Sequence, residues 1–202
     1  YYDDFEQVNM KQGNWLVLAR TKFMLNDLED TLYSQGLYYQ NKFKTNREQD
    51  LYTAVNDWEN LRKGVDINYD QISRISSYMS EKHFEKNCLK YMDKDARHTV
   101  QSLRERMWLK TNDVWYNAFD NAPQKKVRYI RRMRENGEKL NSSPRITLST
   151  IHGVKGGEQD NVVLLTDLSR NTQRNYEQNP DDENRLFYVG ATRTKNHLHI
   201  IR

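Results

Sequence analysis

The glycine-rich segment STIHGVKGGEQD, residues 149–160, holds side chains that could bind a phosphate or a sugar. Thr150, His152 and Lys155 can donate hydrogen bonds to phosphate oxygens, whereas Glu158 only accepts and suits a sugar hydroxyl. The glycines that would let another molecule approach the backbone closely are Gly153, Gly156 and Gly157. The alternative interpretation is a solvated turn whose polar residues are incidental.

Two arginines stand where apolar elements end, and both could serve an anion. Arg20 follows the apolar run NWLVLA, and Arg193 shares a helical face with Leu186, Val189 and Gly190. Burying an unpaired charge costs free energy, so Arg193 needs either solvent or a partner. It could snorkel to solvent at the helix C-terminus, or be held rigidly towards an anion. Arg20 could be an ordinary strand-end charge, or it could converge with Arg193 on one phosphate.

The elements that must position these residues alternate between strand and helix at both ends of the chain. Short apolar runs predict strands at residues 14–20, 37–40, 146–150, 161–167 and 197–201. Helical spacing predicts helices at residues 23–35, capped by Gly36, and at 181–193. The run at 161–167 is apolar on both faces, which is typical of a parallel strand covered by helices. The pattern indicates an α/β domain.

The middle of the chain has a different character, because glycine is scarce and strand patterns are absent. Thr45 and Glu48 form a capping-box pattern before a helix that ends near Gly64. Further helical patterns cover residues 69–78, 81–92, 96–108, 113–119 and 124–136, the last between Pro123 and Gly137. The sequence therefore predicts an all-helical insert at residues 44–140, between domain parts at residues 1–43 and 141–202.

Net charge, the length of the apolar runs and the cysteine count limit the classes of protein to which this chain can belong. The 202 residues carry a net charge of +4, which is compatible with nucleic-acid binding but is weak support by itself. The basic run at 125–134 could follow a phosphate backbone, although a solvated helix face is the favoured interpretation. No apolar run approaches the ~18 residues of a membrane helix. The single cysteine, Cys88, fits a reducing, cytoplasmic setting, and the histidine spacing suggests no metal site.

Three segments, taken in order, resemble motifs of UvrD/Rep-type superfamily 1 DNA helicases. LVLARTKFMLNDLEDTLYSQGLYY is similar to motif IV and the segment after it, ITLSTIHGVKGGEQDNVVLL to motif V, and DENRLFYVGATRTKNHLHII to motif VI. Motifs V and VI, in this order, are specific to the family. The resemblance implies a second RecA-like (2A) domain, with the helical insert where the family places its 2B subdomain.

The resemblance also implies roles for individual residues. In the family, ATP binds between two RecA-like domains, and the second supplies arginines to the γ-phosphate; by motif position these are Arg20 and Arg193. Glu158, beside Gly156, matches the position near the nucleotide sugar. Thr150 and His152 match positions that touch single-stranded DNA, and Lys155 lies in the same loop. One loop would then meet DNA on one side and ATP on the other.

The chain departs from the family pattern at two positions. Where the family usually has Gly-Leu-Glu, this chain has Gly156-Gly157-Glu158. Gly157 thus takes the place of the leucine, which predicts a looser loop. Ala19 replaces a tyrosine that often packs on adenine, so adenine stacking would be lost, relaxed or supplied from elsewhere.

No G-x-x-x-x-G-K-[ST] motif and no acidic pair of Walker B type occurs in the sequence. Together with the resemblance, this absence leads us to expect the C-terminal part of an ATP-dependent DNA helicase, inactive alone, with the P-loop and the Mg²⁺ ligands on its own N-terminal RecA-like half. The resemblance implies that the polarity is 3′ to 5′. Its other expected partners are single-stranded DNA and single/double-strand junctions. Alternatives are a helicase–nuclease subunit, and a DNA-binding or docking module that has lost catalysis.

Overall fold

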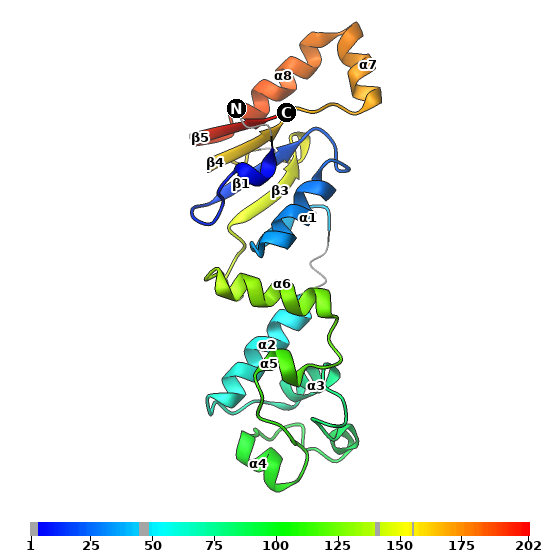
Figure 1. The fold of residues 1–202 in the computed structure, drawn as a ribbon, viewed down its shortest axis with the longest axis vertical. Helices are drawn as coiled ribbons and strands as arrows, with labels where there is room; N and C mark the ends of the chain where they lie inside the picture. The colour runs from blue at the N-terminus through cyan, green and yellow to red at the C-terminus, as the bar shows by residue number, and fades with distance from the viewer. Residues whose placement is uncertain (1–3, 45–48, 140–141, 155) are drawn as a thin grey trace. The chain divides into compact units, whose positions relative to one another are not determined.

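The computed structural model describes residues 4–44, 49–139, 142–154 and 156–202 (Figure 1). The predicted capping box at Thr45 and Glu48 therefore lies outside the described residues, as does Lys155. The chain divides into two compact units. The first unit comprises Tyr1–Asn46 and Arg132–Arg202, and the second comprises Arg47–Arg131.

The first unit is built on a parallel sheet, as the sequence predicted. Its strands are β1 (Trp15–Ala19), β2 (Tyr39–Asn41), β3 (Ile146–Thr150), β4 (Gln159–Leu165) and β5 (Thr194–Ile201). They lie in the order β2-β3-β1-β4-β5, and every neighbouring pair is parallel. Because β3 inserts between β2 and β1, segments on either side of the helical unit share one sheet. The carboxyl ends of β1 and β3 therefore meet, with Ala19 opposite Thr150.

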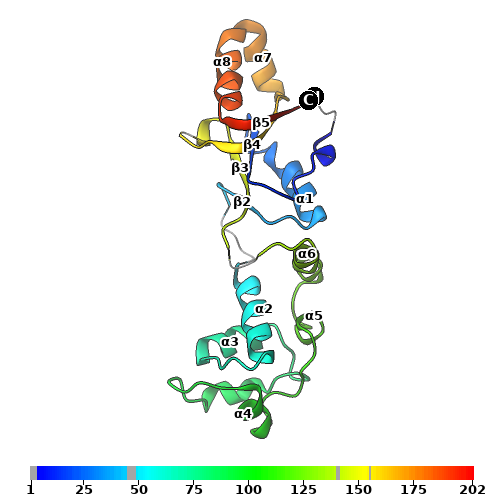
Figure 2. The same ribbon diagram turned by 90° about the vertical axis from the view of Figure 1, so that its left-hand side faces the viewer.

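Two helices cover opposite faces of this sheet, because side chains alternate along each strand. Trp15, Val17 and Ala19 of β1 pack in one core cluster with α1 (Leu25–Gln35), beside which a short 3-10 helix, η1 (Phe5–Gln7), lies. Leu16 and Leu18 pack in a second cluster with α8 (Pro180–Ala191). Figure 2 shows α1 along the sheet and α7 (Arg170–Gln178) beside α8.

The second unit is helical, and the helices within the patterns at 81–92, 96–108 and 113–119 are shorter than predicted. They are α2 (Gln49–Arg62), α3 (Tyr69–Ser77), the 3-10 helix η2 (Lys86–Lys90), α4 (Val100–Glu105), α5 (Trp115–Ala118) and the first part of α6 (Gln124–Glu135). The prediction of a helix over 81–92 is wrong outside η2, because the residues on either side of η2 are not helical. There Phe84 forms an isolated antiparallel bridge with Leu109, so long-range pairing replaces the local helix.

A buried carboxylate ties α2 to α3 in this helical unit. Asp57, only 6% exposed, accepts hydrogen bonds from Gln71 (2.7 Å) and from Arg74 (2.6 Å). Gln71 also completes the capping box of α3 with Asn68. A buried carboxylate needs such hydrogen-bond partners, because burying an unpaired charge costs free energy.

Replacing Asp57 by alanine should therefore destabilise the helical unit by about 1–2 kcal/mol, since it leaves Arg74 and Gln71 without their acceptor. Denaturant unfolding followed by tryptophan fluorescence measures the loss, because Trp58 and Trp115 are buried in this unit. Asp66→Ala is the control. Asp66 also pairs with an arginine, but at a site about half exposed, so its loss should change little. Equal losses in both variants would contradict the prediction.

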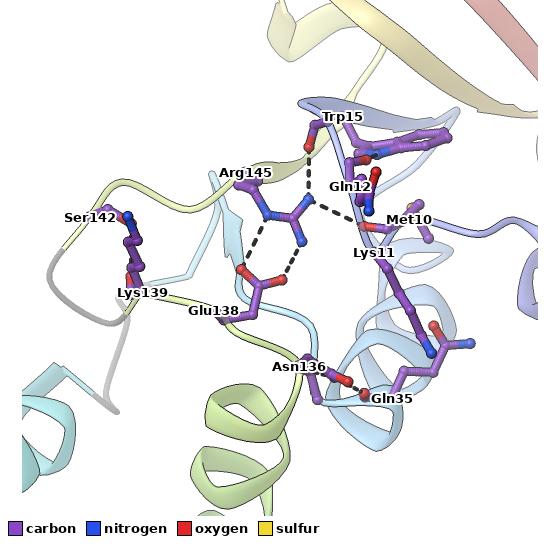
Figure 3. A network of polar contacts seen from close by, with 12 residues as sticks. Met10, Lys11, Gln12, Trp15, Gln35, Asn136, Glu138, Lys139, Ser142 and Arg145 are labelled. Carbon is purple, nitrogen blue, oxygen red and sulfur yellow. Dashed lines mark hydrogen bonds and ion pairs between the residues drawn. The ribbon is translucent and has the colours of Figure 1, made fainter.

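A polar network fixes the chain just before β3 (Figure 3). Arg145 donates to Glu138 through Nε (3.2 Å) and Nη2, and its Nη1 donates to the carbonyls of Gly13 (2.7 Å) and Met10 (3.3 Å). The Glu138 side chain is only 3% exposed. The backbone carbonyl of Arg145 also accepts from the Trp15 N–H at 2.8 Å. This network sets where β3 begins beside β1, and so where the loop that follows β3 emerges.

Candidate functional site

The glycine-rich loop leaves the carboxyl end of β3 and passes beneath α8. It begins with the 3-10 helix η3 (His152–Val154), and its apolar residues Ile151 and Val154 are buried against α8. The Ile151 N–H donates to the carbonyl of Ala19 at 3.1 Å, which joins the loop to the end of β1. Gly156 has a φ of 73°, a conformation that favours glycine. At the other end, the Gln159 N–H donates to the carbonyl of Arg193 at 3.0 Å, so hydrogen bonds hold both ends of the loop.

The predicted DNA-contact residues differ in their surroundings. His152 is exposed. Thr150 is buried, at 8% exposure, and its hydroxyl oxygen accepts a hydrogen bond from the Gly153 N–H at 3.1 Å. The hydroxyl proton stays available for a ligand, but the first role of Thr150 is to hold the loop in shape. Lys155 lies outside the described residues.

Arg193 follows the C-terminal end of α8 and is half-buried. Its Nε donates to the carbonyl of Val189 at 3.1 Å, one helical turn earlier. Arg193 lines a pocket of about 520 Å³, which we call the Arg193 pocket. The other residues of this pocket are Ile151, His152, Val154, Gly156, Leu186 and Val189. Within the described part of the chain, no carboxylate forms an ion pair with Arg193.

Arg20, at the carboxyl end of β1, has a carboxylate partner that sequence analysis missed. Its Nε and Nη2 donate to the two oxygens of Glu183 at 2.7 and 2.8 Å. Glu183 lies in the first turn of α8 and is 6% exposed. The hydrogen bond from Arg20 lowers the pKa of Glu183 from its ordinary value, and His152 adds a smaller effect in the same direction. The carboxylate is therefore ionised at neutral pH.

Arg20 faces a second pocket of about 380 Å³, which we call the Arg20 pocket. Its other residues are Asn175, Gln178, Asn179, Asp182 and Glu183, from α7 and α8. The Arg20 and Arg193 pockets lie towards opposite ends of α8, since the span from Glu183 to Arg193 corresponds to about 15 Å of helix. Convergence of both arginines on one phosphate stays a prediction.

The remaining predicted residues lie around this loop. Glu158 is exposed directly before β4. Ala19 is fully buried in the α1 cluster, so the position where the family often has a tyrosine belongs here to the core. Phe43, which sequence analysis did not single out, is 38% exposed, and its ring atom Cζ lies 3.0 Å from where a side chain on Gly153 would begin.

The profile of the UvrD-like helicase C-terminal domain matches residues 21–202, and the parallel sheet with its loop and α8 agrees with that domain. The chain belongs to this family. Such domains are parts of DNA helicases, which are ATPases, so this UvrD-like domain has a role in a DNA helicase. A search of curated proteins found no match.

Cys88 and the basic run of α6 lie in surroundings that fit a structural role. Burial raises the pKa of the Cys88 thiol to about 11, so this cysteine packs and does not react. In α6, Val127, Ile130 and Met133 are buried while Arg128 is exposed, as expected of an amphipathic helix with a solvated basic face.

Two kinds of feature are absent from the described residues. No cluster of three or more His, Cys, Asp or Glu side chains could hold a metal ion. No described helix combines the length and apolar character needed to cross a membrane.

Proposed function

We propose that this chain is the second RecA-like half of an ATP-dependent DNA helicase or translocase, moving 3′ to 5′. A first RecA-like half would carry the P-loop and the Mg²⁺ ligands. None of the described residues is proposed as a metal ligand.

The shared pocket of His152, Gly156 and Arg193 carries this proposal. It brings the glycine-rich loop against the end of α8, so a residue proposed to touch DNA and one proposed to touch ATP line the same space. Ile151 and Val154 pack with α8 in one core cluster, so a shift of α8 would be expected to move His152 as well.

ATP supplies the phosphoryl group whose transfer to water drives movement, and the residues of this chain would bind and orient it. Arg193, without a carboxylate partner among the described residues, would stabilise charge on the transferring group. Glu158 would accept a hydrogen bond from the sugar, and Gly156 would let the nucleotide approach the backbone. Thr150, His152 and Lys155 would contact the single-stranded DNA backbone.

The test is ATP turnover by the intact protein with and without single-stranded DNA, together with unwinding of duplexes that carry a 3′ or a 5′ tail. DNA-stimulated turnover and a preference for the 3′ tail are expected. Turnover with additional cleavage of the DNA would favour a helicase–nuclease subunit. DNA binding without any turnover would favour the non-catalytic module and overturn the proposal.

Gly153 offers a more local test of the DNA contact. A Cβ at this position would lie 2.9 Å from Ser149 Oγ, 3.0 Å from Phe43 Cζ and 3.1 Å from Thr150 Oγ1. Gly153→Ala should therefore displace the loop and weaken binding of a single-stranded oligonucleotide about tenfold, because an overpacked site costs roughly 1–3 kcal/mol. Fluorescence anisotropy with a labelled oligonucleotide measures the change.

Gly157→Ala is the matched control in the same loop. An added Cβ would make one close contact, with Val154 Cγ2 at 3.0 Å, whereas Gly153→Ala would make three. We expect little change in DNA affinity for this variant. Normal affinity in Gly153→Ala would mean that the loop does not contact DNA.

A further inference from the structure

The contact between Arg20 and Glu183 joins two segments that lie far apart in the sequence. Arg20 ends β1 and Glu183 opens α8, and the pair is bidentate, at 2.7 and 2.8 Å. The side chain of Glu183 is 7% exposed, whereas that of Arg20 is 21% exposed. The carboxylate is thus the buried member, and the guanidinium is the member that reaches open space.

The geometry leaves the guanidinium able to bind a second anion. An arginine has five N–H donors in a planar fork. Glu183 engages Nε and Nη2, which is the side edge of the fork. Among the described residues no acceptor is bonded to the two protons on Nη1 or to the second proton on Nη2, and one proton from each nitrogen forms a parallel pair at the outer edge. Such a pair fits two oxygens of a phosphate.

The position of Glu183 makes its carboxylate a fixed group. It sits in the first turn of α8, where the helix dipole favours negative charge. Burial and the bond to Arg20 together leave it little freedom. On the other side, the Arg20 pocket gives the guanidinium about 380 Å³ of open space.

We propose that Glu183 is the positioning residue for Arg20: it holds the guanidinium by its side edge so that the outer edge meets a phosphate of a bound nucleoside triphosphate. This inference rests on the proposed ATPase function. Glu183 itself touches no substrate. Without it, Arg20 keeps its charge but loses its orientation, and a misplacement of about 1 Å can cost on the order of 100-fold in rate.

The test is DNA-stimulated ATP turnover by the intact protein carrying Glu183→Gln, which keeps the size of the side chain and removes its charge. We expect kcat to fall by about 10- to 100-fold with little change in the KM for ATP. Asp181→Asn, an exposed acidic residue in the same helical turn, is the control and should retain full turnover.

A double-mutant cycle separates positioning from a merely structural role. In an Arg20→Ala background, Glu183→Gln should cause no further loss, because the residue it positions is gone. An equal loss in both backgrounds would overturn the proposal. A higher turnover or a lower KM for ATP in Glu183→Gln would also overturn the proposal. Glu183 would then compete with the phosphate for Arg20 instead of positioning it.

Two outcomes need a further variant or comparison: a Glu183→Gln protein that does not fold, and an unmodified protein without DNA-stimulated turnover. If Glu183→Gln does not fold, Glu183→Asp takes its place, because aspartate keeps the charge but is one methylene shorter. We expect the kcat of Glu183→Asp to be lower than that of the unmodified protein but still measurable. Full turnover in Glu183→Asp would overturn the proposal. If the unmodified protein shows no DNA-stimulated turnover, the proposed function has failed and the role of Glu183 falls with it. If the unmodified protein is active, failure belongs to Glu183 alone.

Discussion

The Arg193→Ala variant of the intact protein should lose DNA-stimulated ATP turnover by roughly 10³-fold or more, while its affinity for single-stranded DNA stays unchanged. An arginine that stabilises charge on a transferring phosphoryl group is worth about 10³–10⁵ in kcat. The proposed role of Arg193 is of this kind, so the loss should appear in kcat more than in the KM for ATP.

The surroundings of Arg193 give the physical reason for so large an effect. Its Nε is held by the carbonyl of Val189, which leaves the terminal nitrogens for an anion. The pocket wall includes Leu186 and Val189, and an apolar wall strengthens the attraction between a guanidinium and a phosphate. Arg193→Lys should recover only part of the rate, because an ammonium lacks the planar fork.

Arg185→Ala is the matched control for Arg193→Ala. Arg185 lies on the same helix, but its side chain is 79% exposed and lines neither pocket described above. We expect normal turnover from this variant. Normal turnover in Arg193→Ala as well would make Arg193 a structural residue that ends α8, and the non-catalytic module would become the better description.

Sequence patterns located the central strands best. β1 lies within its predicted run, since a buried parallel strand leaves a continuous apolar signal, and β3 lies at the predicted residues although Thr147 and Ser149 interrupt its apolar side chains. The cap at Gly36 was also predicted correctly, with a φ of 69°. Local chemistry alone decides such features.

The features that were missed depend on distant parts of the chain. None of the residues of α7 is buried, so it gives no apolar periodicity, and its clearest local signal is the Ser169 cap. The partner of Arg20 is separated from it by 163 residues. Acidic residues are common in the first turn of a helix because the helix dipole favours them there, so nothing in the sequence links Glu183 to β1.

Within the first unit, the chain from Arg132 onward approaches the end of α1 closely at Gly36. Gly36 ends α1 in the left-handed conformation, and its N–H donates to the carbonyls of Leu32 and Tyr33. A Cβ on Gly36 would lie 2.4 Å from Cβ of Arg132 and 2.9 Å from its backbone carbon, so the α6 backbone would have to move. The side-chain amide of Asn136 also donates to the carbonyl of Gly36 at 3.0 Å, so a hydrogen bond joins the same two segments.

Gly36→Ala should therefore destabilise the sheet unit by about 2–4 kcal/mol, from the left-handed strain of alanine together with the overpacked contact. Gly137→Ala isolates the first cause, because Gly137 has a φ of 77° with no atom within 4 Å of an added Cβ. The control should lose only about 1 kcal/mol. Hydrogen exchange of the α1 and β1 amides measures both losses. Equal losses would mean that α6 gives way freely. A larger loss in Gly36→Ala would mean that the backbone at Arg132 cannot give way to the added Cβ.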